Sequence, residues 1–156
     1  MQRYLKIGGF VLTAAFVGLG YYLFGLRDKS GYTEITVILG EQTFKIDVAD
    51  TQLKQAQGLS YRESMAEDRG MLFVFPTEMM QTFWMKDMNF PIDIIWIKGD
   101  TVAGFAESAS PEPGKTLFQL TRYSSPEPVD RVLEVAAGTV ARAGIKVGDK
   151  LTISGL

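Results

Sequence analysis

The first hydrophobic feature of the chain is a run of twenty residues, 7–26, without a charged side chain. Basic residues flank the run on both sides, and it ends in the aromatic residues Tyr21, Tyr22 and Phe24. A helix rises about 1.5 Å per residue, so twenty residues cover the roughly 30 Å hydrocarbon core of a bilayer. Aromatic side chains are enriched at the membrane interface. The pattern therefore predicts a single N-terminal transmembrane helix that inserts the chain into the membrane through residues 7–26.

The length of this run also indicates how the segment is used. A cleaved secretory signal has an apolar region of roughly 7–15 residues and a small-residue cleavage site. The longer run favours an uncleaved anchor over residues 1–29, and export followed by cleavage is the alternative. Long C-terminal domains are translocated largely regardless of their charge. We therefore expect a single-pass protein of the inner (cytoplasmic) membrane whose domain, residues 30–156, lies outside the cytoplasm.

From residue 33 the pattern changes to short apolar runs, rich in β-branched and aromatic residues and separated by Gly and Pro. Such runs predict strands. The expected strands are 33–39, 43–48, 70–75, 82–85, 91–97, 101–107, 117–121, 129–135 and 150–154. Short helices are expected at 50–57, ended by Gly58, and at 139–143. No alternation of strand, helix and strand is evident, so the pattern predicts a mainly β, antiparallel sandwich or barrel.

Composition and charge exclude several function classes. The chain has no histidine and no cysteine, which excludes Ser-His-Asp and Cys-His catalysis, zinc sites built from these residues, and disulfides. Residues 1–29 hold four of the 16 basic residues and one of the 18 acidic ones, so the domain carries 12 basic and 17 acidic residues and a charge of −5. With no basic stripe to contact phosphates, we expect no nucleic-acid partner. No cofactor is predicted.

Three carboxylates stand next to apolar runs and are the first candidates for chemistry. Asp93 interrupts the run 91–97, Glu134 lies within 132–135, and Asp87 follows an aromatic pair. A buried carboxylate must be paired, hydrogen-bonded or protonated. The candidate partners are Arg62, Arg69 and Lys86. Such carboxylates serve in acid–base catalysis, but structural clamps to basic residues or loop amides produce the same pattern, and this interpretation is favoured.

Methionines and aromatic residues suggest two further kinds of site. Six of the seven methionines lie between residues 65 and 88. Thioethers bind soft Cu(I), which makes Met79, Met80, Met85 and Met88 a candidate copper site; methionine also fills gaps in irregular cores. The large aromatic residues near the carboxylates are Phe83, Trp84, Trp96 and Tyr123. Flat rings beside carboxylates can hold a saccharide or a peptide, although aromatic residues on strands more often pack in the core.

Six blocks of sequence stand in order along the chain and carry a family resemblance. They are 58–62 (GLSYR), 70–75 (GMLFVF), 83–87 (FWMKD), 91–95 (PIDII), 124–126 (SSP) and 132–134 (VLE). Together they resemble the DUF192 family, a domain of unknown function, over residues 33–154. The resemblance implies a mainly β, jelly-roll-like sandwich, often preceded by a signal or anchor segment, and it implies no activity. Ser60 stands where the family usually has methionine.

These observations lead to a functional hypothesis. The chain is expected to be a membrane-anchored, extracytoplasmic domain that binds a small polar ligand or an envelope or protein partner. The expected site residues are Arg62, Trp84, Asp87, Asp93 and Glu134. In this site Trp84 would stack on the ligand and Asp87 would hydrogen-bond it, while Arg62 would position Asp93 or meet an anion. The alternatives are a carboxylate-dependent hydrolase of envelope polysaccharide, with Asp87 and Asp93 as acid and base, and an assembly factor for a membrane complex.

Overall fold

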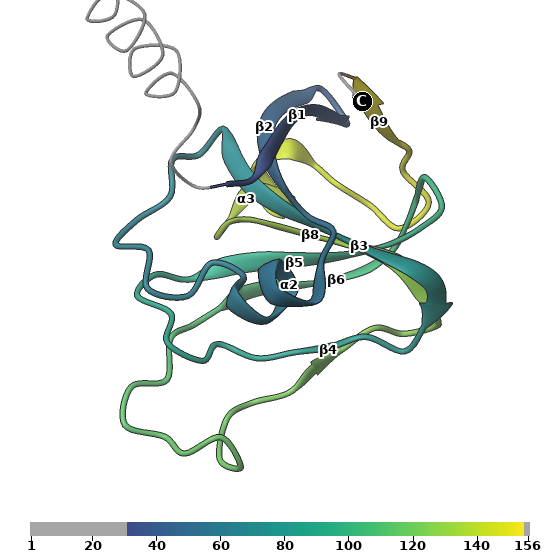
Figure 1. Cartoon of the computed structure of the whole chain (residues 1–156). Coiled ribbons are helices and arrows are strands. Elements are labelled where there is room, and N and C mark those ends of the chain that lie inside the picture. The colour runs from purple at the N-terminus through teal and green to yellow at the C-terminus, as the bar shows by residue number, and fades with distance from the viewer. Residues whose placement is uncertain (1–30, 155–156) are drawn as a thin grey trace, which may run out of the picture. The chain divides into compact units, whose positions relative to one another are not determined.

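The computed structural model describes residues 31–154 (Figure 1). The predicted transmembrane helix over residues 7–26 lies outside the described residues. Within residues 31–154, none of the helices combines the length and the apolar character needed to cross a bilayer.

Nine strands and two short helices make up the described part of the chain. The strands are β1 (Thr33–Leu39), β2 (Gln42–Ala49), β3 (Arg69–Met79), β4 (Thr82–Phe83), β5 (Ile92–Lys98), β6 (Thr101–Ala109), β7 (Tyr123–Ser124), β8 (Val129–Ala136) and β9 (Leu151–Ser154). The helices are α2 (Gln52–Gln57) and α3 (Thr139–Ala143). Seven strands form one sheet in the order β6-β5-β8-β3-β2-β1-β9, and β4 pairs with β7 in a separate two-stranded ribbon. The predicted mainly β class and both short helices are confirmed.

The sheet is mixed, so the prediction of an antiparallel sandwich or barrel is wrong in the direction of one strand pair, although the sheet curls as a half-barrel. Strands β2 and β3 pair in parallel, with Ile46 opposite Gly70 and Val48 opposite Leu72, while the other pairs of the sheet are antiparallel. Parallel neighbours require a crossover instead of a hairpin, and residues 50–68, which include α2, provide it. Residues 31–154 therefore contain one strand–helix–strand unit, and their seven-stranded sheet curls on itself instead of packing against a second large sheet.

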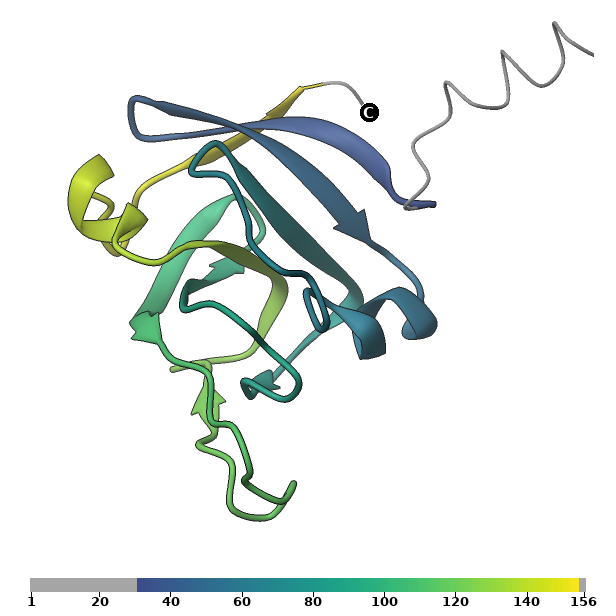
Figure 2. The same cartoon turned by 90° about the vertical axis from the view of Figure 1, so that its left-hand side faces the viewer.

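The curl brings the two edges of the sheet together at one end. Thr101, at the start of β6, forms a bridge with Lys150, the residue before β9. The Val102 N–H donates to the Asp149 carbonyl at 2.9 Å, and the Leu151 N–H donates to the Asp100 carbonyl at 2.7 Å. Figure 2 shows the resulting half-barrel in side view.

The main core fills the concave side of this sheet. Because side chains alternate between the two faces of a strand, β1 contributes Ile35, Val37 and Leu39, and β5 contributes Ile95 and Ile97. Val140 of α3 packs in the same cluster. The neighbouring positions of β3, β5 and β8 face the other side of the sheet. That outer face is covered by the crossover and by the segment between β3 and β5, and it is where the candidate site forms.

One predicted strand, 117–121, is not a strand. Residues 110–122 form a long loop between β6 and β7 that extends away from the sheet in both views (Figures 1 and 2). Pro111 and Pro113 lack the backbone N–H that strand pairing needs. Glu112 holds the loop together instead, because its carboxylate accepts the backbone N–H of Thr121 at 2.8 Å and the hydroxyl of the same residue at 2.9 Å.

Candidate functional site

A cavity of about 380 Å³ lies on the outer face of the sheet, between α2, β3 and residues 81–88. This volume falls in the range of small-molecule sites, roughly 300–1,000 Å³. The apolar lining includes Ala56, Leu59, Phe73, Phe75, Phe83, Trp84, Met85, Met88 and Ile92. The polar lining includes Gln81, Lys86 and Glu134. An apolar cavity with a few convergent polar groups is the usual form of a ligand site.

Helix α2 forms one wall of the cavity, and short-range interactions fix its position. Thr51 caps the helix by accepting the Lys54 N–H at 3.3 Å, and Gly58 ends it with a φ of 52°, a conformation that glycine adopts without steric cost. The Gln55 side-chain amide donates to the Val74 carbonyl of β3 at 2.8 Å. This bond ties the helix to the sheet beneath it, so the wall is preformed.

The opposite wall is built by the β4–β7 ribbon. Gln81 and Ser125 bond each other twice: the Gln81 N–H donates to the Ser125 hydroxyl at 3.0 Å, and the Ser125 N–H donates to the Gln81 carbonyl at 2.9 Å. Phe83 meets Phe73 edge to face, with ring centroids 4.9 Å apart, a favoured aromatic geometry. These contacts position the aromatic side chains of the ribbon over β3.

Glu134 lies at the floor of the cavity, in a row of side chains that crosses three strands. Register places Asp47 of β2 beside Met71 of β3, and Met71 beside Glu134 of β8. Only 6% of Glu134 is exposed, and burial raises the pKa of its carboxyl from 4.5 to about 8, against the opposing effect of the nearby Arg62 charge. Desolvation disfavours the ionised form. Glu134 is therefore mainly protonated at pH 7.

Trp84 is half-exposed at the mouth of the same cavity. Its exposed fraction is 41%, and the guanidinium carbon of Arg122 lies 4.5 Å from the ring centroid. This is a cation–π contact between the ribbon segment and the end of the 110–122 loop. The structure thus brings Trp84 and Glu134, two of the five predicted site residues, to one cavity.

Asp87 lines a second, adjoining cavity of about 330 Å³ that shares Met85, Lys86 and Met88 with the first. Its carboxylate accepts the Tyr61 hydroxyl at 2.7 Å and forms an ion pair with Lys86. Both partners keep the pKa of Asp87 below its usual value. The Tyr61 N–H donates to the Asp87 carbonyl at 2.9 Å, which joins two residues with left-handed backbone, at φ of 65° and 55°.

Asp93 lies away from both cavities, fully buried on the concave side of the sheet. Its carboxylate accepts the backbone N–H groups of Ser108 at 2.8 Å, Gly138 at 3.2 Å and Val140 at 2.8 Å. Arg62 instead donates to Asp47 at 2.7 Å, so the prediction that Arg62 positions Asp93 is wrong. The physical reason is that alternation along the strands places Asp93 on the concave face and Asp47 on the outer face. Asp93 is a structural clamp to loop amides, the interpretation that the sequence favoured.

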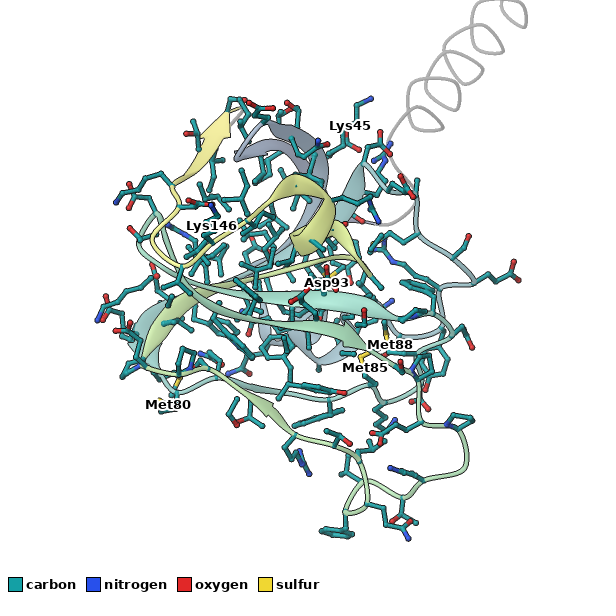
Figure 3. The ribbon with its side chains drawn as sticks, turned by 180° about the vertical axis from the view of Figure 1, so that it is seen from behind. Lys45, Met80, Met85, Met88, Asp93 and Lys146 are labelled. Carbon is teal, nitrogen blue, oxygen red and sulfur yellow. The ribbon has the colours of Figure 1, made fainter. Side chains whose placement is uncertain are left out.

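The candidate methionines do not converge. Met85 and Met88 lie near each other, whereas Met80 lies on a distant part of the molecule (Figure 3). Met79 and Met80 are about half-exposed, at 53% and 55%, and Met85 is buried. The four thioethers therefore do not form one set of ligands, and Met85 and Met88 serve as apolar lining.

Gln81 is the site residue that sequence reasoning missed. It is only 8% exposed, it lines the first cavity, and within residues 31–154 its side-chain nitrogen Nε2 has no hydrogen-bond partner. Buried polar groups are nearly always paired. The sequence gives only a weak signal, because Gln81 and Thr82 are two polar residues that stand between a pair of methionines and the aromatic pair Phe83-Trp84.

Comparisons with known proteins place this fold among uncharacterised relatives. A crystal structure from Sinorhizobium meliloti 1021, described as a "putative transcription regulator", is 35% identical, with a TM-score of 0.71 over 80% of this chain and 97% of that one. A protein of unknown function from Novosphingobium aromaticivorans DSM 12444 is 32% identical, with a TM-score of 0.72 over 81% and 89%. No curated protein matches the chain.

The family comparison agrees with the resemblance that the sequence blocks carry. The model of DUF192, described as "Uncharacterized ACR, COG1430", matches residues 35–153. This range spans β1 to β9 and includes both cavities and every residue that lines them. The chain therefore belongs to the DUF192 family of uncharacterised proteins.

Proposed function

We propose that this protein is a membrane-anchored binding protein whose domain lies outside the cytoplasm and holds a small ligand in the cavity beneath α2. The observation that carries the proposal is the unpartnered, buried Nε2 of Gln81, a residue that lines a cavity together with four aromatic residues and two methionines. Leaving such a donor unpaired costs about 1–3 kcal/mol. A ligand with an apolar body and a polar end would cover the aromatic side chains and supply the missing acceptor.

Binding is favoured over hydrolysis by the placement of the carboxylates. A hydrolase of the glycosidase type needs two carboxyl groups in one cleft, roughly 5–9.5 Å apart. Asp93 has no exposed surface and three backbone donors on its oxygens, so it has no access to a substrate. Glu134 is the single carboxylate in the lining of the first cavity. The proposed pair of Asp87 and Asp93 therefore lacks the arrangement that the reaction requires.

The charge of the domain supports a small ligand over a nucleic acid. Residues 30–156 carry 17 acidic and 12 basic side chains, and an acidic surface repels a phosphate backbone. For this reason we do not extend the description of the Sinorhizobium relative to this chain. A protein or other envelope partner stays compatible with the proposal where it offers a small group to the cavity.

Ligand entry is testable through the two tryptophans, each of which gives one indole N–H signal in NMR. The probes are benzyl alcohol, benzamide, benzoate and benzylamine, added to the full chain in a mild detergent at pH 7. We expect at least one probe to shift the Trp84 signal saturably, because Trp84 lines the cavity. The signal of Trp96, which is 5% exposed in the core, is expected to stay in place.

Two variants on the same helix control for binding elsewhere. Ala56→Phe places a ring at a position that lines the cavity, and it is expected to weaken the Trp84 response at least about fivefold by occupying the space. Gln52→Phe adds the same ring at an exposed position outside the lining and is expected to leave the response unchanged. If no probe gives a saturable Trp84 shift, or if both variants respond equally, the cavity is not a ligand site.

The proposed location has its own test in bacterial cells that express the full chain. We expect the protein to stay in the membrane pellet after an alkaline carbonate wash, because residues 7–26 are long enough to span the bilayer. Protease added to intact spheroplasts is expected to remove the domain. Deletion of residues 7–26 is the control and should yield carbonate-soluble protein. Extraction of the full chain by carbonate would contradict the anchor, and protection until lysis would contradict the orientation.

A further inference from the structure

Gln81 lines the cavity and carries a buried hydrogen-bond donor that has no acceptor. The backbone of Gln81 is held on both sides by Ser125, at 3.0 and 2.9 Å, so the residue cannot move away from the cavity without breaking the ribbon. Its Nε2 has no partner within residues 31–154. A neutral amide nitrogen donates and does not accept. The ligand that fits this position therefore presents an oxygen acceptor.

The buried carboxyl of Glu134, another polar group of the lining, offers a donor and an acceptor together. The Glu134 carboxyl makes no hydrogen bond within the described residues, and its burial raises its pKa to about 8. At pH 7 it is an un-ionised acid with one O–H donor and one carbonyl acceptor. A carboxamide complements such an acid, because its oxygen accepts the O–H while its N–H donates to the carbonyl.

The charges around Glu134 provide no partner for an ionised ligand. Arg62, in the segment after α2, is the positive charge that acts on Glu134. Its guanidinium forms an ion pair with Asp47 of β2 at 2.7 Å. On β3 and β5 its register neighbours are the apolar Met71 and Ile94. Lys86, the other charged residue of the lining, is ion-paired with Asp87. An ionised group of a ligand would lose its hydration on entering this cavity and would gain no free counter-charge there.

We propose that the cavity recognises an uncharged carboxamide group carried on a flat apolar body. The amide would bond Gln81 and Glu134, and the apolar body would pack against Phe73, Phe83 and Trp84. This inference rests on the proposed function, because it names the chemical class of the ligand in the same cavity. Both a free small molecule and an amide of a peptide present this chemistry.

The test compares three probes that share one ring and differ in charge: benzamide, benzoate and benzylamine. Their dissociation constants are measured at pH 7 from the Trp84 indole shift of the full chain in detergent. We expect benzamide to bind at least about tenfold more tightly than the two ionised probes. N-acetyl-phenylalaninamide tests the peptide source: tighter binding than benzamide indicates a peptide ligand, and weaker binding indicates a small molecule.

Variants of the two polar residues locate the amide. Gln81→Met keeps the length of the side chain and deletes the donor, so benzamide affinity is expected to fall about five- to thirtyfold. Gln52→Met makes the same change at an exposed position outside the cavity and is expected to have no effect. Equal benzamide binding by Gln81→Met and the native chain would overturn the proposal.

The protonation state of Glu134 gives a second, independent readout. With a pKa of about 8, about one molecule in eleven keeps the neutral acid at pH 9, so the dissociation constant of benzamide is expected to rise about tenfold. Lys86 and Tyr61, whose pKa values are raised above 10.5 and 10.0, do not titrate in this interval. Glu134→Gln keeps a donor and an acceptor and is expected to bind benzamide equally at both pH values.

The outcomes separate this inference from the proposed function. Tighter binding of benzylamine would make the cavity a cation site, and tighter binding of benzoate would make it an anion site; either result overturns the carboxamide assignment and leaves the ligand cavity in place. A pH-independent benzamide affinity in the native chain also overturns it. If benzyl alcohol shifts Trp84 and benzamide does not, the carboxamide assignment is overturned and the ligand cavity stays; failure of all four probes, benzyl alcohol included, contradicts the ligand cavity itself.

Discussion

Asp93→Ala is expected to lower the free energy of unfolding by about 3–5 kcal/mol. The substitution removes the acceptor of the three backbone N–H groups of Ser108, Gly138 and Val140. An unsatisfied buried donor such as that of Val140 costs about 1–3 kcal/mol, and the part-buried donors of Ser108 and Gly138 add smaller losses. Two of these groups belong to residues with left-handed backbone, Ser108 at φ 53° and Gly138 at φ 80°. The carboxylate therefore also holds a conformation that Ser108 adopts only under constraint.

This prediction is measured by urea unfolding of the full chain in detergent at pH 7, together with amide hydrogen exchange. We expect faster exchange at the three named N–H groups. Asp149→Ala is the matched control, because this carboxylate accepts a single backbone N–H, from Lys146 at 2.8 Å, in an exposed turn; its cost should stay within about 1 kcal/mol. If Asp93→Ala does not fold, Asp93→Asn keeps one acceptor oxygen and should show an intermediate loss. Native stability and native exchange in either Asp93 variant would refute the clamp.

Glu134→Gln is expected to stabilise the protein by up to about 3 kcal/mol at pH 7. The pKa of Glu134 rises from 4.5 in the unfolded chain to about 8 in the folded one. Between these values the folded state binds the proton and the unfolded state does not, so the free energy of unfolding falls by about 1.4 kcal/mol per pH unit as pH rises. The glutamine side chain is neutral at every pH in this range, so the free energy of unfolding of the variant does not fall in this way.

The sign of the effect fixes its pH window. Below pH 4.5 both states of the native chain hold the proton, and the advantage of the variant is expected to vanish; it should grow through neutral pH and level off above about pH 8. Thermal and urea unfolding of the native chain and Glu134→Gln at several pH values measure it. Glu41→Gln, at an exposed turn, should show no such trend. A stability difference that is the same at pH 4 and pH 8 would show that Glu134 is ionised in the fold.

Local sequence signals predicted the strands well, and they failed where the outcome depends on contacts distant in sequence. The hairpin around Gly99-Asp100 and the short helix ended by Gly58 follow from turn and cap chemistry, and both form. The sequences of β2 and β3 do not predict that these strands pair in parallel, because parallel and antiparallel pairing would bury the same alternating set of side chains. The run 117–121 has strand composition, but no neighbouring strand pairs with it.

The same distinction holds for the candidate site. Trp84 and Glu134 could be chosen from sequence because an aromatic residue and a carboxylate in apolar surroundings are visible locally, and both line the first cavity. The partner of Arg62 could not be predicted, since Asp47 and Asp93 are both carboxylates on strands and only the faces of the curled sheet distinguish them. Gln81 was missed because the sequence does not show that its side-chain nitrogen is buried without a hydrogen-bond partner.

The bridge between Thr101 and Lys150 has a consequence for how the protein is made. The sheet closes only when residues 148–154 reach β1 and the turn before β6, so a growing chain on the ribosome holds an open, unfinished sheet until these residues emerge. Closing so large a loop is slow compared with forming hairpins, and unpaired strand edges attract one another in the meantime. Assembly of the native sheet therefore waits for β9, and the open edges of the sheet stay exposed to pairing with other chains until this strand is in place.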